Sequence, residues 1–566
     1  MKFTKIILAL LVLLALNVNA KDIKLTETTN QFVITSKSLS EFTFVSHLSE
    51  ISTMRVKKDA NEFVKIIVNG YGENAEKGNA ELPVLEELIN VPFGSTVAIK
   101  ILNKEETIIS LSDYGIDNLI FPSQPSLSKS ENSEDVPFYF NDEYYSYDGF
   151  YTNDLVTSEL LGKMRGQQLA RLSIAPFSYN PNTNELKVVT KLEVKIIFKN
   201  IDSEGHKINK QKYYSPEFNN LFKECINYIP SQEKDVITTY PVKYVIISDP
   251  AFESTLQPLV DWKTKKGFIV VEGYTNDPNV GNTTTSIHAF IKDMYDNPID
   301  GIAPTYLLIV GDDGQVPSFD NGQHLSDMYY CEFDGGGDFY PELYYGRFSA
   351  TIPEEVQVQV EKTITHEQYL FSDPSFLDEV VLVAGVDASM APTYGNGQIN
   401  YGTDNYFNVA HGLTVYNYLY GSGTPITSDM PQASAAIIAD VSAGVGFANY
   451  TAHCGSSGWA DPSFSTSDIS GLQNFDEYGV MVGNCCQSNK FDVPVCFGEG
   501  LLRANNKGAV GYIGGSNNTY WNEDFWWAVG NGSISANPTY AGTGLAVFDC
   551  LMHENGEQQA DWFITT

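Results

Sequence analysis

The chain has 566 residues, of which 43% are hydrophobic and 13% aromatic, and this composition suits several folded globular domains. It holds 35 lysines and arginines against 70 aspartates and glutamates, so its formal net charge is −35. This acidity argues against nucleic-acid binding, which needs basic patches. It suits a secreted protein, cation binding or attraction of basic substrates. Equally, the acidic side chains of the surface could serve only to keep the protein soluble.

Residues 1–20 have the pattern of a secretory signal peptide. Lys2 and Lys5 precede an apolar run from Ile6 to Leu16, and Val18-Asn19-Ala20 is a small-residue cleavage site. The run is too short to cross a membrane, and no other stretch of the sequence is a candidate span. We therefore expect a secreted or cell-surface protein without a membrane span.

Residues 21–235 are predicted to form an all-β domain. Alternating apolar and polar runs, such as residues 63–68 and 192–198, are separated by turns rich in Gly, Asn and Pro. This pattern predicts a β-sandwich, with a long polar loop at about residues 122–160. A polar linker follows at about 226–241, where an exposed processing site is expected and Lys234 is one plausible position.

From about residue 242 the pattern changes to alternating strands and helices. The expected strands are buried apolar runs, and amphipathic stretches lie between them. Such alternation predicts a mostly parallel sheet with helices on both faces. The main expected strands are residues 243–248, 268–271, 306–312 and 380–384, and the main expected helices are residues 256–265, 286–295, 353–370, 432–441 and 497–505.

Two further apolar runs end in side chains with catalytic potential. The run from Gly444 leads to His453, and the run from Gly479 leads to Cys486. Both are typical of buried parallel strands, and ligands of open α/β sheets bind at the carboxyl ends of such strands. The two side chains are therefore expected to face one cleft, as a thiol nucleophile and its base must. The ordinary alternative is a core histidine and a small buried cysteine.

The cysteines and five short motifs add detail to this region. There are seven cysteines, an odd number, so an exported chain would leave at least one thiol unpaired. Alternation along a strand sends Cys485 and Cys486 to opposite faces. The motifs are Ala448-Asn449-Tyr450-Thr451-Ala452-His453, Trp459-Ala460-Asp461-Pro462, Gly483-Asn484-Cys485-Cys486, Pro494-Val495-Cys496-Phe497-Gly498-Glu499 and Tyr520-Trp521-Asn522-Glu523-Asp524.

Together these motifs resemble the gingipain-type cysteine peptidases, which are relatives of caspases and legumains. The resemblance extends over about residues 240–530 and is nearest to the lysine-specific members. It implies an α/β, caspase-like catalytic domain with a mostly parallel sheet and flanking helices, divided into subdomains at residues 240–375 and 376–566. It also implies that residues 21–235 are a propeptide that covers the active site until it is removed.

The resemblance assigns catalytic roles to single residues. Cys486, rather than Cys485, matches the nucleophile, His453 matches the acid/base, and Asp387 matches the group that orients the histidine. The family usually has glycine directly after the catalytic histidine, whereas here Cys454 stands in that place. We expect backbone N–H groups near Cys454 and Gly455 to form the oxyanion hole.

Specificity is expected to depend on a counter-charge for a basic substrate side chain, because a desolvated ammonium without a partner is costly. The resemblance points to Asp524 for this contact and to Thr451 as its helper. Trp521 lies beside Asp524 in the sequence, and aromatic rings of this segment could cover the aliphatic stem of a lysine. Arginine-specific relatives place their selecting acid elsewhere, and Asp404 is a candidate for that position.

A calcium site is expected on the glycine-rich segment 333–342. Carboxylates on such a loop can wrap a hard cation. The acids are Asp334, Asp338 and Glu342, together with Asp312 after the preceding strand. The spacing is not that of an EF-hand, and an acidic solvated loop is the alternative, but the resemblance implies calcium. No organic cofactor is expected.

The sequence therefore predicts a secreted cysteine endopeptidase, made as a zymogen, that cleaves proteins or peptides after Lys, with Arg second. Its partners would be these substrates and its own propeptide. The main alternative is an inactive homologue that acts as an adhesin or binding protein, which the change at Cys454 favours. A different thiol-dependent hydrolase on a similar sheet is a third possibility.

Overall fold

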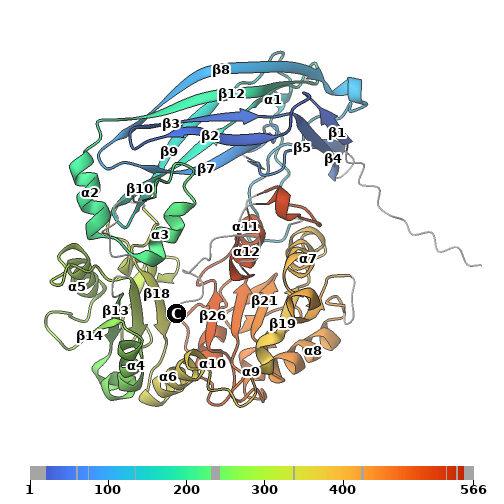
Figure 1. Ribbon diagram of the computed structural model, residues 1–566. Helices are drawn as coiled ribbons and strands as arrows, with labels where there is room; N and C mark the ends of the chain where they lie inside the picture. Colours follow the sequence, from blue (N-terminus) through green and yellow to red (C-terminus); the bar gives the residue numbers. More distant parts are fainter. Residues whose placement is uncertain are drawn as a thin grey trace, which may run out of the picture.

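The structure is a computed structural model that places an N-terminal β domain over two α/β units (Figure 1). The predicted signal peptide, residues 1–20, and residues 231–241 of the predicted linker, including Lys234, lie outside the described residues. Within the described part of the chain, no helix combines the length and the apolarity needed to cross a membrane. The described residues are 21–58, 61–73, 75–133, 135–230, 242–335, 338–421, 426–530, 532–543 and 546–552.

The N-terminal domain consists mainly of antiparallel strands, which confirms the prediction of a β-rich segment. Three sheets, in the orders β1-β4-β5, β6-β7-β10-β9 and β11-β12-β3-β2, share one hydrophobic core, and β8 also pairs with β12. The strands are β1 (Lys21–Lys24), β2 (Gln31–Lys37), β3 (Glu41–His47), β4 (Glu50–Lys58), β5 (Asn61–Ile67), β6 (Gly72–Glu73), β7 (Pro83–Val91), β8 (Thr96–Ser110), β9 (Val156–Met164), β10 (Gln167–Ile174), β11 (Phe177–Asn180) and β12 (Glu185–Lys199).

Alternation explains how these strands bury one face. In β12 the apolar side chains of Leu192, Val194 and Ile196 are buried, whereas the residues between them are partly exposed. Between β8 and β9, the described residues of the segment 111–155 form only single helical turns, including α1 (Asp142–Tyr145), and isolated β-bridges. Two helices that the sequence did not predict end the domain, namely α2 (Ser203–Lys212) and α3 (Pro216–Lys223).

The first α/β unit has four parallel strands in the order β14-β13-β15-β18. Helix α5 packs on one face through Ile287 and Ile291, and helices α4 and α6 pack on the other through Leu256 and Val356. The elements are β13 (Lys243–Ser248), α4 (Glu253–Lys265), β14 (Ile269–Tyr274), α5 (Thr284–Asp296), β15 (Tyr306–Val310), β16 (Phe319–Asp320), β17 (Leu325–Ser326), β18 (Tyr344–Phe348) and α6 (Pro353–Glu367).

The second α/β unit has five parallel strands in the order β20-β19-β21-β25-β26. Helices α8 and α10 pack on one face, and α7, α11 and α12 pack on the other. The elements are β19 (Glu379–Ala384), α7 (Asn396–Asn405), β20 (Thr414–Tyr418), α8 (Met430–Ser442), β21 (Phe447–Thr451), β22 (Cys454–Gly455), β23 (Gly458–Trp459), β24 (Phe464–Ser465), α9 (Thr466–Ile469), β25 (Val480–Asn484), α10 (Phe497–Arg503), β26 (Gly511–Gly514), α11 (Trp521–Val529) and α12 (Val547–Met552).

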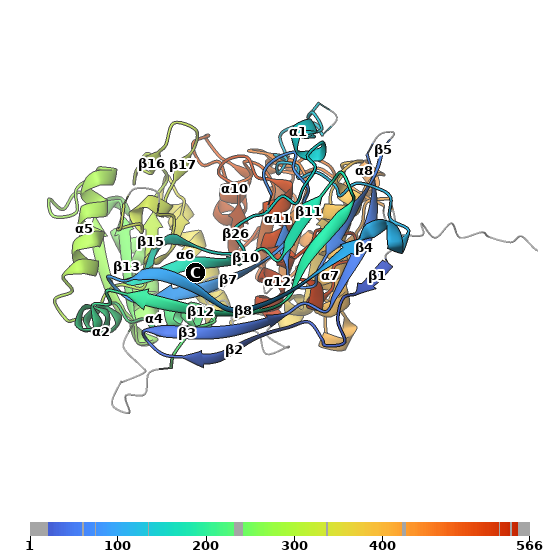
Figure 2. The ribbon, with the colours of Figure 1, turned by 90° about the horizontal axis from the view of Figure 1, so that it is seen from above.

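This arrangement confirms the predicted α/β fold in two subdomains, each of which has its own parallel sheet. Gly479, directly before β25, is a glycine for a steric reason, because a Cβ there would lie 2.0 Å from the carbonyl oxygen of Val445. Figure 2, seen from above, shows the long strands β8 and β12 reaching from one α/β unit toward the other. The N-terminal domain therefore lies across both units.

Candidate active site

The histidine and the cysteine follow neighbouring parallel strands. The ladder between β21 and β25 ends at the pair Thr451 and Asn484, and His453 and Cys486 each lie just beyond it. Both side chains consequently lie at the same edge of the sheet. Cys485 is fully buried in the core and is joined by a disulfide to Cys454, whereas Cys486 forms no disulfide.

Asp387 lies next to the imidazole, as the sequence predicted. It follows β19, and its Oδ2 lies 2.9 Å from Nε2 of His453. The N–H groups of Ser389 and Met390 donate to the other carboxylate oxygen at 2.9 and 2.8 Å. Burial acts to raise the pKa of Asp387, but these bonds outweigh it and lower that pKa. The hydrogen bond that His453 donates to Asp387 raises the pKa of His453. Nδ1 of His453 is thus free of Asp387 and lies against the carbonyl oxygen of Lys129.

The Cys486 thiol contacts a backbone segment rather than the histidine. Its Sγ donates to the carbonyl oxygen of Thr519 at 3.9 Å and accepts from the N–H of Thr519 at 3.4 Å. Burial raises the pKa of Cys486, although the Thr519 N–H and the nearby Lys129 ammonium act against this rise. In this state the thiol is buried, and its ionisation is disfavoured.

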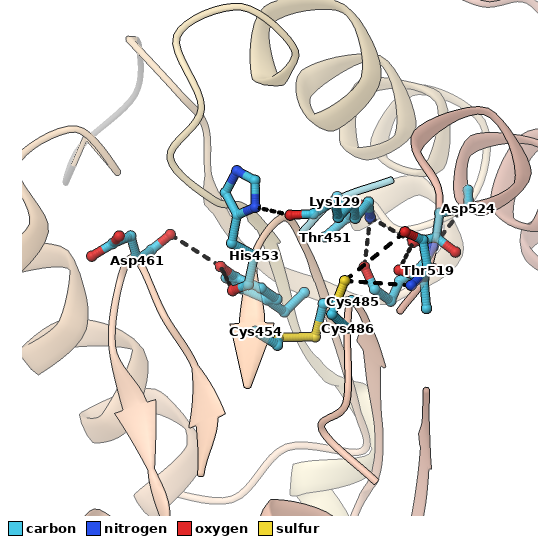
Figure 3. Close-up of a disulfide and its surroundings, with 11 residues drawn as sticks. Lys129, Thr451, His453, Cys454, Asp461, Cys485, Cys486, Thr519 and Asp524 are labelled. Carbon is cyan, nitrogen blue, oxygen red and sulfur yellow. Dashed lines mark hydrogen bonds and ion pairs between the residues drawn. A yellow bond between two sulfur atoms is a disulfide. The ribbon is translucent and has the colours of Figure 1, made fainter. Parts of the chain in front are cut away.

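The group that covers it is Lys129, which comes from the segment between β8 and β9 of the N-terminal domain (Figure 3). Its side chain is 0% exposed, and its Nζ lies 2.7 Å from Oδ2 of Asp524. The ammonium also donates to the carbonyl oxygen of Asn484 at 2.7 Å and to Oγ1 of Thr451 at 3.0 Å. The ring centroid of Trp521 lies 4.7 Å away. All three residues predicted to bind a substrate lysine therefore surround this lysine.

The backbone around Lys129 lies along the site as a short added strand. Ser128 forms an antiparallel bridge with Tyr520, the N–H of Lys129 donates to Thr519 at 2.9 Å, and the N–H of Trp521 donates to Leu127 at 3.0 Å. Peptides that pair with an exposed backbone edge are commonly held in this way. The carbonyl oxygen of Lys129 accepts a hydrogen bond from Nδ1 of His453.

Sequence reasoning missed Lys129 because it stands in a serine-rich loop with no other chemical groups. The run Ser126-Leu127-Ser128-Lys129-Ser130 has no strand or helix pattern. The available signal was chemical, since a lysine in the predicted propeptide matches the predicted preference of the site for lysine.

The predicted oxyanion residues lie beside the dyad. Cys454 and Gly455 form β22, which pairs with β23 in a small hairpin directly after His453. Among the described contacts, the carbonyl oxygen of Lys129 is bonded to the histidine ring and not to either of these N–H groups. The role of Cys454 and Gly455 in an oxyanion hole stays a prediction.

Asp404, the alternative candidate for the acid that determines substrate specificity, does not contact Lys129 in the described structure. It is exposed near the end of α7, whereas Lys129 contacts Asp524. The contacts of the bound lysine therefore favour Asp524 as the counter-charge.

The predicted calcium site stays a prediction, and the structure shows the contacts of its four acids. Asp312 pairs with Arg503 of α10 at 3.0 Å. The other three acids lie near Lys163 of β9, whose Nζ is 2.9 Å from Asp334 and whose N–H donates to Asp338 at 2.7 Å. The described residues contain no group of three Asp, Glu, His or Cys side chains arranged to hold a metal ion.

The carboxyl group of Glu342 is buried next to a second acid, and a nearby cation would stabilise its ionised form. Its side chain is almost fully buried, and burial together with the adjacent Asp334 raises the pKa of Glu342 to about 10. Two neighbouring carboxyl groups of this kind favour a positive partner. Lys163 of the N-terminal domain supplies one at Asp334.

Comparison with known proteins agrees with this geometry. The model of peptidase family C25 matches residues 237–561, and the model Propeptide_C25 matches residues 29–215. Lys-gingipain W83 of Porphyromonas gingivalis is 35% identical over 98% of this chain and 32% of its own length. Gingipain R2 of P. gingivalis (strain ATCC BAA-308 / W83) is 27% identical over 80% of this chain and 62% of its own length.

A solved structure described as "Structure of Protease" is 37% identical with a TM-score of 0.51, and the match covers 56% of this chain and 68% of that chain. The chain spans about a third of the length of the Lys-gingipains that it matches.

Proposed function

The chain belongs to peptidase family C25, and from this premise we propose that it is a cysteine endopeptidase, made as a zymogen, that cleaves after lysine. The observation that carries the proposal is the position of Lys129. A lysine side chain lies among Asp524, Thr451 and Trp521, and its carbonyl group lies at His453. A relative named Lys-gingipain supports the same preference.

The acceptors around the ammonium favour lysine over arginine. An ammonium has three N–H donors. Here its three partners are Asp524, the carbonyl oxygen of Asn484 and Thr451. A guanidinium is planar and presents five donors in a rigid fork, so it matches these partners less well. Arginine is therefore expected as the second choice.

In the proposed reaction a substrate lysine takes the place of Lys129. Cys486, as thiolate, attacks the scissile carbonyl carbon, and the C–N bond breaks as His453 gives a proton to the leaving amine. Because Asp387 holds Nε2, the nitrogen that serves the substrate is Nδ1. Asp387 keeps the imidazole oriented and stabilises its protonated form. Water then releases the acyl group from the thiol.

The same contacts explain why we infer that the N-terminal domain is inhibitory. Lys129 fills the lysine site, and its carbonyl oxygen is bonded to His453. Burial raises the pKa of Cys486, so the thiolate is disfavoured while the site is closed. The match of Propeptide_C25 to residues 29–215 supports a removable inhibitor. The signal-like residues 1–20 support export of the chain.

We also propose a structural calcium ion held by Asp334, Asp338 and Glu342 once Lys163 has left. Oxygen ligands of this kind suit calcium, and the raised pKa of Glu342 indicates that its carboxylate lacks sufficient positive charge nearby. The ion would fix the loop after β15 and take no part in the reaction. Asp312, which pairs with Arg503, is left out of this set.

The specificity proposal is tested with a panel of peptides that differ only in the residue before the cut. We expect Lys peptides to be cleaved best and Arg peptides second. Asp524→Asn should lower kcat/KM for Lys peptides by about 100-fold or more, since removing one partner of a buried ion pair costs about 3–5 kcal/mol. Turnover of peptides with an uncharged residue there should change little.

Asp404→Asn is the matched control, because it removes an exposed acid that does not contact Lys129. It should leave the ratio of Lys to Arg cleavage unchanged. Preference for Asp, Asn or apolar residues, or an Asp524→Asn enzyme that cleaves Lys peptides normally, would overturn the specificity.

A labelling experiment distinguishes an active peptidase from an inactive binding protein. An acyloxymethyl-ketone probe with lysine before the warhead should label the processed chain, and Cys486→Ala should abolish both labelling and hydrolysis. Absence of both in the wild-type processed chain would favour the inactive homologue.

A further inference from the structure

The disulfide between Cys454 and Cys485 joins the two turns that carry the catalytic pair. Cys454 directly follows His453, and Cys485 directly precedes Cys486. The Cα atoms of the two half-cystines lie 5.4 Å apart, within the ordinary range for a disulfide. A covalent bond thus connects the neighbour of the base to the neighbour of the nucleophile (Figure 3).

Other contacts hold each turn to a different part of the fold. The carbonyl oxygen of His453 accepts from the Tyr450 hydroxyl at 2.9 Å and from the N–H of Ala460 at 3.0 Å. On the cysteine side, the N–H of Gln487 donates to Asn517 at 2.9 Å. Because the β21–β25 ladder stops at Thr451 and Asn484, regular strand pairing does not continue into these turns.

We propose that the Cys454–Cys485 disulfide is a positioning crosslink, which fixes the His453 imidazole relative to the Cys486 thiol for the proposed peptidase reaction. Catalysis by an acid/base and a nucleophile is sensitive to displacements of about 1 Å. The two turns that carry His453 and Cys486 lie beyond the last paired residues of the ladder, so they are free to make such displacements. The crosslink restricts this movement.

The crosslink has a second effect on the chemistry of the nucleophile. Three cysteines lie together in this site, and a disulfide between Cys486 and either of the others would remove the reactive thiol. Pairing Cys454 with Cys485 consumes both competitors and leaves Cys486 reduced. The active form therefore needs one disulfide and one thiol at the same site.

This arrangement predicts an unusual response to reductants. A phosphine such as TCEP converts the disulfide into two thiols, while the phosphine becomes a phosphine oxide with oxygen taken from water. Thiol peptidases ordinarily need reduction to keep the nucleophile free. Here, reduction of the crosslink should lower activity although Cys486 stays intact.

The test compares the wild type with Cys454→Gly/Cys485→Ala, each prepared as the full chain and then processed by proteolysis. Three measurements are made: kcat and KM for a Lys peptide, the pH dependence of Cys486 alkylation by iodoacetamide, and the melting temperature. We expect kcat to fall about tenfold or more, with KM within about twofold. The midpoint of the alkylation profile should move to higher pH, because His453 no longer lies where it stabilises the thiolate.

Cys331→Ala is the matched control, since Cys331 is a buried thiol in the core of the first α/β unit. It should leave kcat and the alkylation profile as in the wild type. Wild-type kcat and alkylation profile in the double variant would overturn the inference, and a change in melting temperature alone would show a purely structural role. If the wild type cleaves no peptide, the proposed function fails, and the alkylation profile still decides the inference.

If the double variant does not fold, the crosslink is removed from the wild type with a reductant instead. TCEP is titrated into the processed chain, and mass spectrometry of the peptides that contain Cys454 and Cys485 measures the reduced fraction. A fall of kcat in proportion to that fraction supports the crosslink, and full kcat after complete reduction overturns it.

Discussion

Among single residues, Lys129 explains most about how the site is held closed. Its ammonium is fully buried, and burial lowers the pKa of Lys129 although Asp524 acts to raise it. A buried ammonium is tolerated only when charge and hydrogen bonds compensate for lost water. Asp524 supplies the charge, and Asn484 and Thr451 accept the remaining hydrogen bonds.

Lys129→Met should therefore weaken latency in the uncut chain. The change keeps the length of the side chain but leaves Asp524 buried without its partner, at a cost of about 3–5 kcal/mol. We expect alkylation of Cys486 by iodoacetamide, measured on the full chain, to become at least about 100-fold faster.

Lys163→Met is the control for this experiment, because Lys163 is a half-exposed lysine of the same domain that pairs with Asp334 outside the site. An exposed ion pair contributes only about 0–1 kcal/mol, so this variant should stay close to wild type. Equal alkylation rates in Lys129→Met and wild type would contradict the assigned role of Lys129.

Among the elements, helix α10 joins the two α/β units. Its Glu499 accepts from Ser349 of the first unit at 2.6 Å and pairs with Arg503 at 2.7 Å. Arg503 also reaches Asp312 at 3.0 Å, and Lys362 of α6 donates to the carbonyl oxygens of α10 at Leu501 and Leu502, each at 3.0 Å. In this network Asp312 takes part in the contact between the two units.

Arg503→Met should destabilise the junction by about 3–5 kcal/mol, since the buried Glu499 and the partly buried Asp312 lose their shared partner. The measurement is the urea midpoint of the full chain. Arg503→Met/Glu499→Gln should recover part of the loss, because it removes one uncompensated charge. Arg171→Met, which removes a partly exposed pair with Glu159, is the control. A midpoint unchanged by Arg503→Met would show that the network does not stabilise the junction.

At the scale of the whole molecule, the N-terminal domain engages both α/β units at charged sites. Lys129 contacts the second unit, at Asp524. Lys163 and the buried Arg165 contact the first unit. Arg165 donates to the backbone carbonyl oxygen of Glu342 at 3.0 Å, close to the acids around Lys163. Removal of this domain therefore changes the charge of the active site and of the acidic loop together.

Calcium should consequently stabilise the processed chain more than the full chain. Without Lys163, the acids Asp334, Asp338 and Glu342 lose the ammonium beside them. At about 100 times its Kd, calcium would add about 2.7 kcal/mol, which corresponds to a rise in Tm of a few degrees for a domain of this size. Melting curves in calcium and in EGTA provide the measurement.

Glu342→Gln should remove most of this calcium effect. Asp404→Asn, which removes an exposed acid elsewhere, should leave it intact. A processed chain whose Tm is the same in calcium and in EGTA would exclude the proposed ion.

Much of the fold could be predicted because its patterns are local. Apolar runs such as residues 380–384 and 447–451 form strands whose direction and burial follow from periodicity and length. The position of His453 and Cys486 at one sheet edge followed from the rule that parallel strands end at the same side. The site residues around Lys129 were named through motif resemblance, and their catalytic and binding roles stay predictions.

The remaining features depended on residues far apart in the chain. The structure alone paired Asp312 with Arg503, a contact between residues 191 positions apart. Nor did the seven cysteines indicate which two would pair, because several pairings are compatible with the same count. Cys454 and Cys485 came together only when β21 and β25 became neighbours.

The sequence by itself determined the α/β and all-β segments, the strand ends that carry the histidine and the cysteine, and the family of the chain. These follow from residues that are neighbours in sequence, where periodicity and short motifs act. Only the tertiary structure placed Lys129 beside the residues expected to bind a substrate lysine, because its hydroxyl partner Thr451 lies 322 residues away. No local pattern records which surface of one domain docks on another, since that choice depends on shape and charge that exist only after both have folded.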